Sequence, residues 1–162
     1  MTGGRCGLRL DRAGMTMIEL LSVLVILGTL TSMALPRLGN TVYQAQVAKA
    51  IGDIRAIQID LQTIEANGDT LPSSLGAIGR GSLLDPWGNP YQYLKFAPKK
   101  GKGGGPPGQA RKDRFLVPIN STYDLYSMGR DGKTASPLTA SSSRDDIVRA
   151  NDGGFIGLAW KF

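Results

Sequence analysis

The sequence contains no histidine and only one cysteine, Cys6, among its 162 residues. Without histidine the chain lacks the commonest general base of enzymes and a usual protein ligand of zinc. It also has no phosphate-binding glycine-rich loop, no nucleophile elbow and no pair of carboxylates spaced for catalysis. These absences argue against an enzyme, and against an ATPase in particular.

Charge is scarce between Met15 and Leu35, where Glu19 is the only charged residue in 21 positions. A helix of this length spans roughly 32 Å, close to the ~30 Å hydrocarbon core of a bilayer. Soluble core helices seldom stay apolar on every face for so long. We therefore predict a transmembrane helix over residues 15–35. The short basic segment 1–14 places the N-terminus in the cytoplasm and sends the head across the membrane.

Glu19 requires an explanation, because a carboxylate at the centre of a membrane helix costs roughly 2.5–3.5 kcal/mol on insertion scales. A cut between Gly14 and Met15 would supply a partner, since it creates a positively charged α-amine at the start of the apolar segment. Opposite charges 4 Å apart attract by about 4 kcal/mol at an effective dielectric constant near 20. The same chain or a neighbouring subunit could provide that amine. The alternative is a glutamate that snorkels to the membrane interface.

The order Gly14, Met15-Thr-Met-Ile-Glu19, an apolar run and then Pro36 resembles the class III signal of type IV pilins and pseudopilins. Members usually carry Phe as the first mature residue, and Met15 preserves its bulk and apolarity. The resemblance implies that a prepilin peptidase cleaves after Gly14 and methylates the new amine, which Glu19 neutralises during assembly. The implied partners are other copies in a helical homopolymer, an inner-membrane assembly platform and minor pseudopilins.

Beyond the membrane segment, apolar residues recur every three or four positions between residues 47 and 64. This spacing predicts an amphipathic helix over residues 36–66, continuing past a kink at Pro36. A coiled coil is the weaker alternative, because fewer than four heptads are present. Residues 67–162 would form an α+β head, with the long helix packed on a small antiparallel sheet. Its predicted elements are a short helix opening at 71–75 and strands at 91–96, 123–128 and 155–162.

Residues 98–114 are rich in glycine and proline and carry an excess of positive charge. Their basic side chains are Lys99, Lys100, Lys102, Arg111, Lys112 and Arg114. A DNA-uptake pilin could use such a patch to bind nucleic acid. The segment lacks interleaved aromatic residues that would stack on bases. We therefore favour a solvated loop and do not expect a nucleic-acid partner.

Acidic residues bracket the later loop, with Asp131 near its start and Asp145 and Asp146 at its end. The loop has little apolar content to offset the entropy lost on ordering. A calcium ion could fix it through carboxylate and carbonyl oxygens, although the EF-hand pattern is absent. Solvated aspartates in turns are the alternative.

The stretches 84–91, 123–132 and 145–147 resemble the head of the major pseudopilin of type II secretion. In that family a calcium ion ties down the C-terminal loop, which implies Asp131, Asp145, Asp146 and the Met128 carbonyl as ligands. Two departures are a Ser/Thr-rich loop and an extra segment after it. The implied function is a structural subunit of a secretion pseudopilus that drives protein export. A type IV pilus pilin is the alternative, disfavoured because such pilins commonly close this region with a disulfide and Cys6 lies in the leader.

Overall fold

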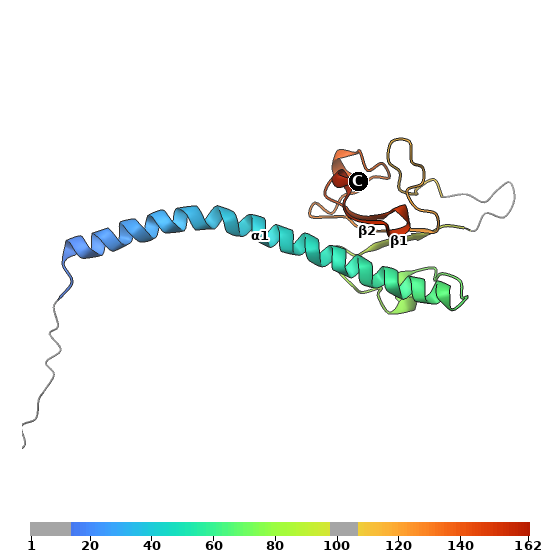
Figure 1. The fold of residues 1–162 in the computed structure, drawn as a ribbon, viewed down its shortest axis with the longest axis horizontal. Coiled ribbons are helices and arrows are strands. Elements are labelled where there is room, and N and C mark those ends of the chain that lie inside the picture. Colours follow the sequence, from blue (N-terminus) through green and yellow to red (C-terminus); the bar gives the residue numbers. More distant parts are fainter. Residues whose placement is uncertain (1–13, 98–106) are drawn as a thin grey trace, which may run out of the picture. The chain divides into compact units, whose positions relative to one another are not determined.

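A computed structural model describes residues 14–97 and 107–162, and for residues 35–38 it describes the backbone alone. Its longest element is α1, Met17–Ala66, with 50 residues (Figure 1). The chain divides into two compact units, residues 1–41 and residues 42–162, and α1 contributes to both. The end of α1 at Ala66 agrees with the helix end predicted from the sequence.

The first unit contains the apolar half of α1. This part of the helix is long and apolar enough to cross a membrane, and its most apolar stretch is exposed in the described part of the chain. The backbone continues as a helix through Pro36 instead of ending there. A single-pass membrane anchor therefore fits this unit.

The second unit contains a four-stranded antiparallel sheet in the order β1-β2-β3-β4. Its strands are β1 (Gln92–Lys95), β2 (Tyr123–Ser127), β3 (Ile147–Ala150) and β4 (Phe155–Leu158). The predicted pairing of the first two is confirmed, with Gln92 opposite Tyr126 and Lys95 opposite Tyr123. Each strand pairs with the next along the chain, so the sheet is a meander.

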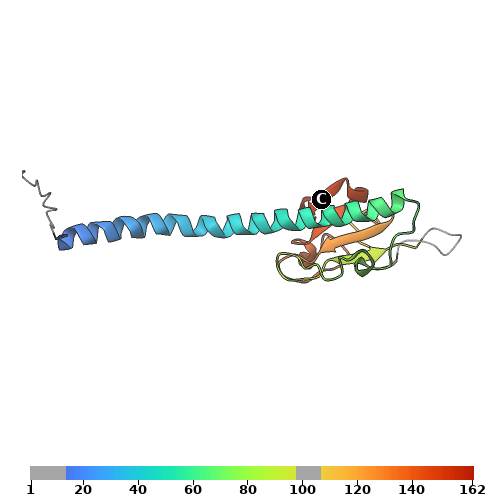
Figure 2. The same cartoon turned by 90° about the horizontal axis from the view of Figure 1, so that it is seen from below.

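The part of α1 in this unit lies against one face of the sheet, as Figure 2 shows. Its fully buried side chains are Ala50, Ile54, Ile57 and Leu61. They repeat at steps of three and four, so they form one stripe on the helix. On the sheet they pack in one cluster with Tyr123, Leu125 and Ile147. The predicted amphipathic helix and the α+β fold are confirmed.

The opposite face of the sheet carries a second, smaller apolar cluster. Val148 and Ala150 of β3 belong to it, together with Ile119, Leu138 and Ala159 from the connecting segments and the C-terminal end. Ile147 and Val148 are neighbours in β3 but belong to different clusters, because successive side chains of a strand point to opposite faces. The sheet is therefore covered on both sides.

The structure differs from the sequence prediction in three elements. The short helix predicted to open at 71–75 is a 3₁₀ helix at Leu75–Ile78. The last strand ends at Leu158, and a 3₁₀ helix at Ala159–Lys161 follows it. The strand β3 was not predicted at all, because all four of its residues are buried, including Arg149, and no alternation of polar and apolar residues marks it.

Candidate functional site

The residues predicted to be cleaved lie just before α1 begins. Gly14, Met15 and Thr16 have no regular secondary structure and are exposed. Among the described residues, apart from Gly14 and its neighbours in the chain, no atom lies within 4 Å of the position that a Cβ atom at Gly14 would take. In the described part of the chain, nothing therefore covers the Gly14–Met15 peptide bond, and the bond lies outside the helix.

Thr16 and Glu19 form a reciprocal cap at the start of α1. The Thr16 backbone N–H and hydroxyl both donate to Glu19 Oε2, each at 2.9 Å, and the Glu19 N–H donates to Thr16 Oγ1 at 3.3 Å. This is the capping-box arrangement, in which two side chains satisfy free N–H groups of a helix N-terminus. The Glu19 carboxylate is thus folded back toward Met15, the residue whose amine a cut after Gly14 would expose.

The other polar residues of the apolar segment are satisfied within the helix itself. Ser22 donates to the Glu19 carbonyl at 2.8 Å, Thr29 to the Ile26 carbonyl at 2.8 Å, and Thr31 to the Leu27 carbonyl at 2.7 Å. In hydrocarbon an unpaired hydroxyl would be costly. Glu19 is consequently the one ionisable group that this segment would carry into a membrane.

The predicted basic patch is only partly within the described residues. Lys99, Lys100 and Lys102 lie outside them. Arg114 is exposed and Lys112 is half-buried, but Arg111 has only 2% of its surface exposed. Arg111 is therefore buried, whereas a basic surface patch requires it to be exposed. Its side chain is paired with a buried carboxylate.

That partner is Asp146, one of the residues implied as a calcium ligand. The Arg111 Nη2 forms a buried ion pair with Asp146 Oδ2, and both side chains are almost completely inaccessible. The Thr134 hydroxyl donates to the same carboxylate oxygen at 2.7 Å. Burial raises the pKa of Asp146 to about 6, while the charge of Arg111 and the hydrogen bond from Thr134 act in the opposite direction. At neutral pH the carboxylate is still mostly ionised and is neutralised by Arg111.

The other two residues implied as calcium ligands through their carboxylates, Asp131 and Asp145, are joined by a hydrogen bond. The Asp131 backbone N–H donates to Asp145 Oδ2 at 3.0 Å, and Asp131 Oδ1 accepts from the Lys133 N–H at 2.8 Å. Asp131 is exposed and Asp145 is half-buried. Met128 follows the last residue of β2, and next to it Gly129 approaches the Asp145 backbone so closely that a Cβ atom would lie 2.4 Å from the Asp145 carbonyl oxygen.

These positions decide how well the implied ligands fit a calcium ion. Asp131 and Asp145 have exposed or half-exposed carboxylates that a cation can reach. At Asp146 one oxygen accepts from Arg111 and Thr134, and the other is buried with no partner among the described residues, so a cation could bind there only beside the Arg111 guanidinium. No group of three or more acidic, cysteine or histidine side chains converges anywhere in residues 14–97 and 107–162. Calcium binding by Asp131, Asp145, Asp146 and the Met128 carbonyl stays a prediction.

Sequence reasoning did not anticipate the buried charges of the head. Besides Arg111 and Asp146, the structure buries Asp85, Asp124 and Arg149. Arg149 lies over the Tyr123 ring, 4.1 Å from its centroid, and donates to the Asn120 side chain at 3.2 Å. Charged residues are usually exposed, so no local pattern distinguishes these five from surface charges.

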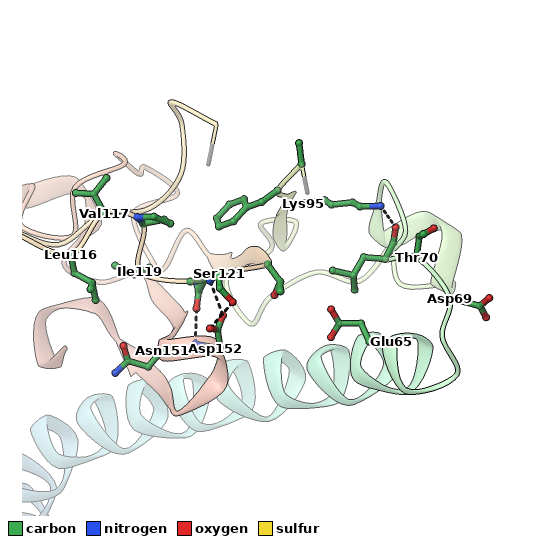
Figure 3. Close-up of a pocket in the computed structure, with 16 residues that line it drawn as sticks. Glu65, Asp69, Thr70, Lys95, Leu116, Val117, Ile119, Ser121, Asn151 and Asp152 are labelled. Carbon is green, nitrogen blue, oxygen red and sulfur yellow. Dashed lines mark hydrogen bonds between the residues drawn. The ribbon is translucent and has the colours of Figure 1, made fainter. Parts of the chain in front are cut away.

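A groove of about 950 Å³ lies near the C-terminal end of α1 (Figure 3). Glu65 and Asp69 line it from α1 and the turn that follows, and Lys95 lines it from β1. Lys95 donates to the Leu71 carbonyl, and Ser121 donates to Asp152 at 2.8 and 2.7 Å. Several of its polar groups are thus paired with one another, and the groove shows no nucleophile paired with a base among the described residues.

Several known proteins with sequences similar to this chain carry the same name, type II secretion system core protein G. The type II secretion system core protein G of Pseudomonas aeruginosa is 34% identical over 146 residues, which cover 77% of this chain and 88% of the relative. The core protein G of Aeromonas hydrophila is 29% identical over 146 residues, covering 77% and 87%. That of Vibrio cholerae is 28% identical over 150 residues, covering 80% and 88%.

No protein-family model matches the chain, and no solved structure matches it. The relatives nevertheless show the family of this chain, because the Pseudomonas aeruginosa protein is 34% identical and 88% of its length is covered. The chain therefore belongs to the family of type II secretion system core protein G, the major pseudopilin.

Proposed function

We propose that this pseudopilin is made as a precursor, that a prepilin peptidase cuts it between Gly14 and Met15 and methylates the new amine, and that the mature chain polymerises. The filament would grow from the inner membrane and push secreted proteins outward. The chain is anchored by one span, with its N-terminus in the cytoplasm and its head in the periplasm. The subunit is structural, in line with the absence of histidine and of catalytic motifs.

The observation that carries this proposal is the position of Glu19. Its carboxylate already binds the backbone N–H of Thr16, the residue next to Met15. After cleavage the α-amine of Met15 would lie within about one helical turn of Glu19, in the same chain or supplied by a neighbour. Neutralisation of the two charges removes the cost of holding either in the membrane.

The apolar part of α1 explains why such a subunit would polymerise. Its most apolar stretch is exposed in the described part of the chain, so each subunit presents a continuous apolar surface. In the membrane this surface meets lipid, and in a filament it would meet the same surface of other copies. Withdrawal from the bilayer is then possible only if neighbouring helices replace the lipid.

Three further partners follow from this function. An inner-membrane assembly platform would receive the subunit, and minor pseudopilins would share the filament with it. The energy would come from a separate ATPase, since the sequence contains no phosphate-binding loop.

The proposal is tested by the mass and N-terminal sequence of the protein from membranes of cells with and without prepilin peptidase. We expect a mature chain that begins at methylated Met15 only in cells with the enzyme. The precursor should accumulate in cells without the enzyme. It should still be membrane-bound, because the cut lies before the apolar segment and the segment therefore stays in the chain whether or not the cut is made. A chain that begins at Met1 in both strains would contradict the proposal.

A further inference from the structure

The loop between β2 and β3, residues 128–146, contains the residues predicted to bind a calcium ion that would fix the loop. The structure instead places a side chain of the protein beneath this loop. Arg111, from the segment between β1 and β2, reaches the last residue of the loop by its ion pair with Asp146. A fixed cation thus already lies at one of the three carboxylates predicted to bind calcium.

Arg111 also binds the middle of the same loop. Its Nη1 donates to Thr134 Oγ1 at 2.6 Å and to the Ala135 carbonyl. Thr134 in turn donates to Asp146. One guanidinium therefore joins residues near the middle of the loop to its end, which is the task that a bound cation would perform through several oxygen ligands.

The position of the guanidinium is fixed from the sheet side as well. It stacks over the Tyr126 ring of β2 at 3.9 Å from the centroid, and the Arg111 backbone N–H donates to Asp124 Oδ2 of β2 at 2.6 Å. Asp124 is held by a further hydrogen bond from Asn120 at 2.9 Å. The residue is thus preorganised by the sheet before it contacts the loop.

A divalent cation at Asp146 would have to bind Oδ1, because Oδ2 already accepts from Arg111 and Thr134. The two oxygens of the carboxylate would have to serve two cations in a buried site, where repulsion between positive charges is weakly screened. Asp131 and Asp145 contact each other near the surface and are not part of the Arg111 network. We propose that Arg111 is the cation that holds the 128–146 loop on the sheet, so that the head keeps its fold without calcium.

This proposal concerns the head alone and is independent of cleavage and polymerisation. Its test uses the full-length chain in detergent, with excess calcium or excess EGTA. Thermal unfolding measures overall stability, and limited trypsin digestion measures the loop, because Arg130, Lys133 and Arg144 are exposed cleavage sites within it. For the unsubstituted chain we expect the same melting temperature and the same cleavage rate in both solutions.

Substitution of Arg111 then supplies the positive result. Arg111→Met keeps much of the apolar length but leaves Asp146 charged and buried, so we expect cleavage in the loop to be at least about tenfold faster. Arg149→Met is the matched control, since it removes a buried arginine that contacts Tyr123 and Asn120 instead of the loop. It should leave the rate of cleavage within the loop close to that of the unsubstituted chain.

The double variant Arg111→Met/Asp146→Asn separates loss of the pair from failure to fold. Removing both charges should slow the cleavage again relative to Arg111→Met alone, because no unpaired buried charge remains. The proposal is overturned if EGTA lowers the melting temperature or speeds loop cleavage of the unsubstituted chain. It is equally overturned if Arg111→Met and Arg149→Met give the same loop cleavage.

Discussion

Replacing Ile57 by alanine should weaken the head far more than replacing Ile59 by alanine. The two residues are of one type, two positions apart on α1. Ile57 is completely buried between the helix and the sheet, whereas Ile59 is 61% exposed. The comparison therefore tests which face of α1 is docked.

The magnitude follows from the burial. Truncating a fully buried isoleucine to alanine costs about 2–5 kcal/mol, the loss of burial plus the cavity left behind. A surface substitution is usually within about 0.5 kcal/mol. Alanine is a better helix former than isoleucine at both positions, so that effect cancels in the difference. Since a domain is stable by only about 5–15 kcal/mol, Ile57→Ala should remove a large share of the total.

The assay is chemical denaturation of the full-length chain in detergent, followed by tryptophan fluorescence. Trp87 is half-buried and its ring lies 6.2 Å from that of Tyr43 on α1, so its emission reports on docking of the helix. Relative to the unsubstituted chain, we expect a clearly lower denaturant concentration at the unfolding midpoint for Ile57→Ala and a nearly unchanged one for Ile59→Ala. Equal shifts for both variants, or a larger shift for Ile59→Ala, would refute the helix register described above.

Three further outcomes are expected. Glu19→Gln preserves the size of the side chain but removes its charge, so membrane insertion should persist while the yield of sheared filaments falls by roughly tenfold or more, as loss of a several-kcal/mol charge pair implies. Gly129→Ala should destabilise the head by more than the roughly 1–2 kcal/mol of left-handed strain, because a Cβ atom would clash with Asp145. Gly68→Ala, also at positive φ but in open space, should show the strain alone in the same denaturation assay. Asp85→Ala should lower the unfolding free energy by at least about 3 kcal/mol, since its buried carboxylate accepts three hydrogen bonds and each lost partner costs about 1–3 kcal/mol; an unchanged midpoint of denaturation would contradict this estimate.

The N-terminal half of this protein could be interpreted from the sequence because its determinants are local. Twenty-one residues with one charge specify a membrane helix by composition alone. The cap between Thr16 and Glu19 joins residues three positions apart, and the buried stripe of α1 repeats at the helical period. The pairing of β1 with β2 was also predictable, since aromatic residues and alternation mark both strands.

The strand β3 and the buried charges were decided only by the tertiary structure. Arg111 and Asp146 are 35 positions apart and meet only when the segment before β2 folds over the end of the loop before β3. In the sequence Arg111 is one of several basic residues, and Asp146 is one of two adjacent aspartates. Whether such a charge faces solvent, a metal or an opposite charge depends on its neighbours in space, and the energy of each choice is set by burial. The sequence by itself thus determined the anchor, the long helix and the family of the protein, while the tertiary structure determined which cation neutralises Asp146.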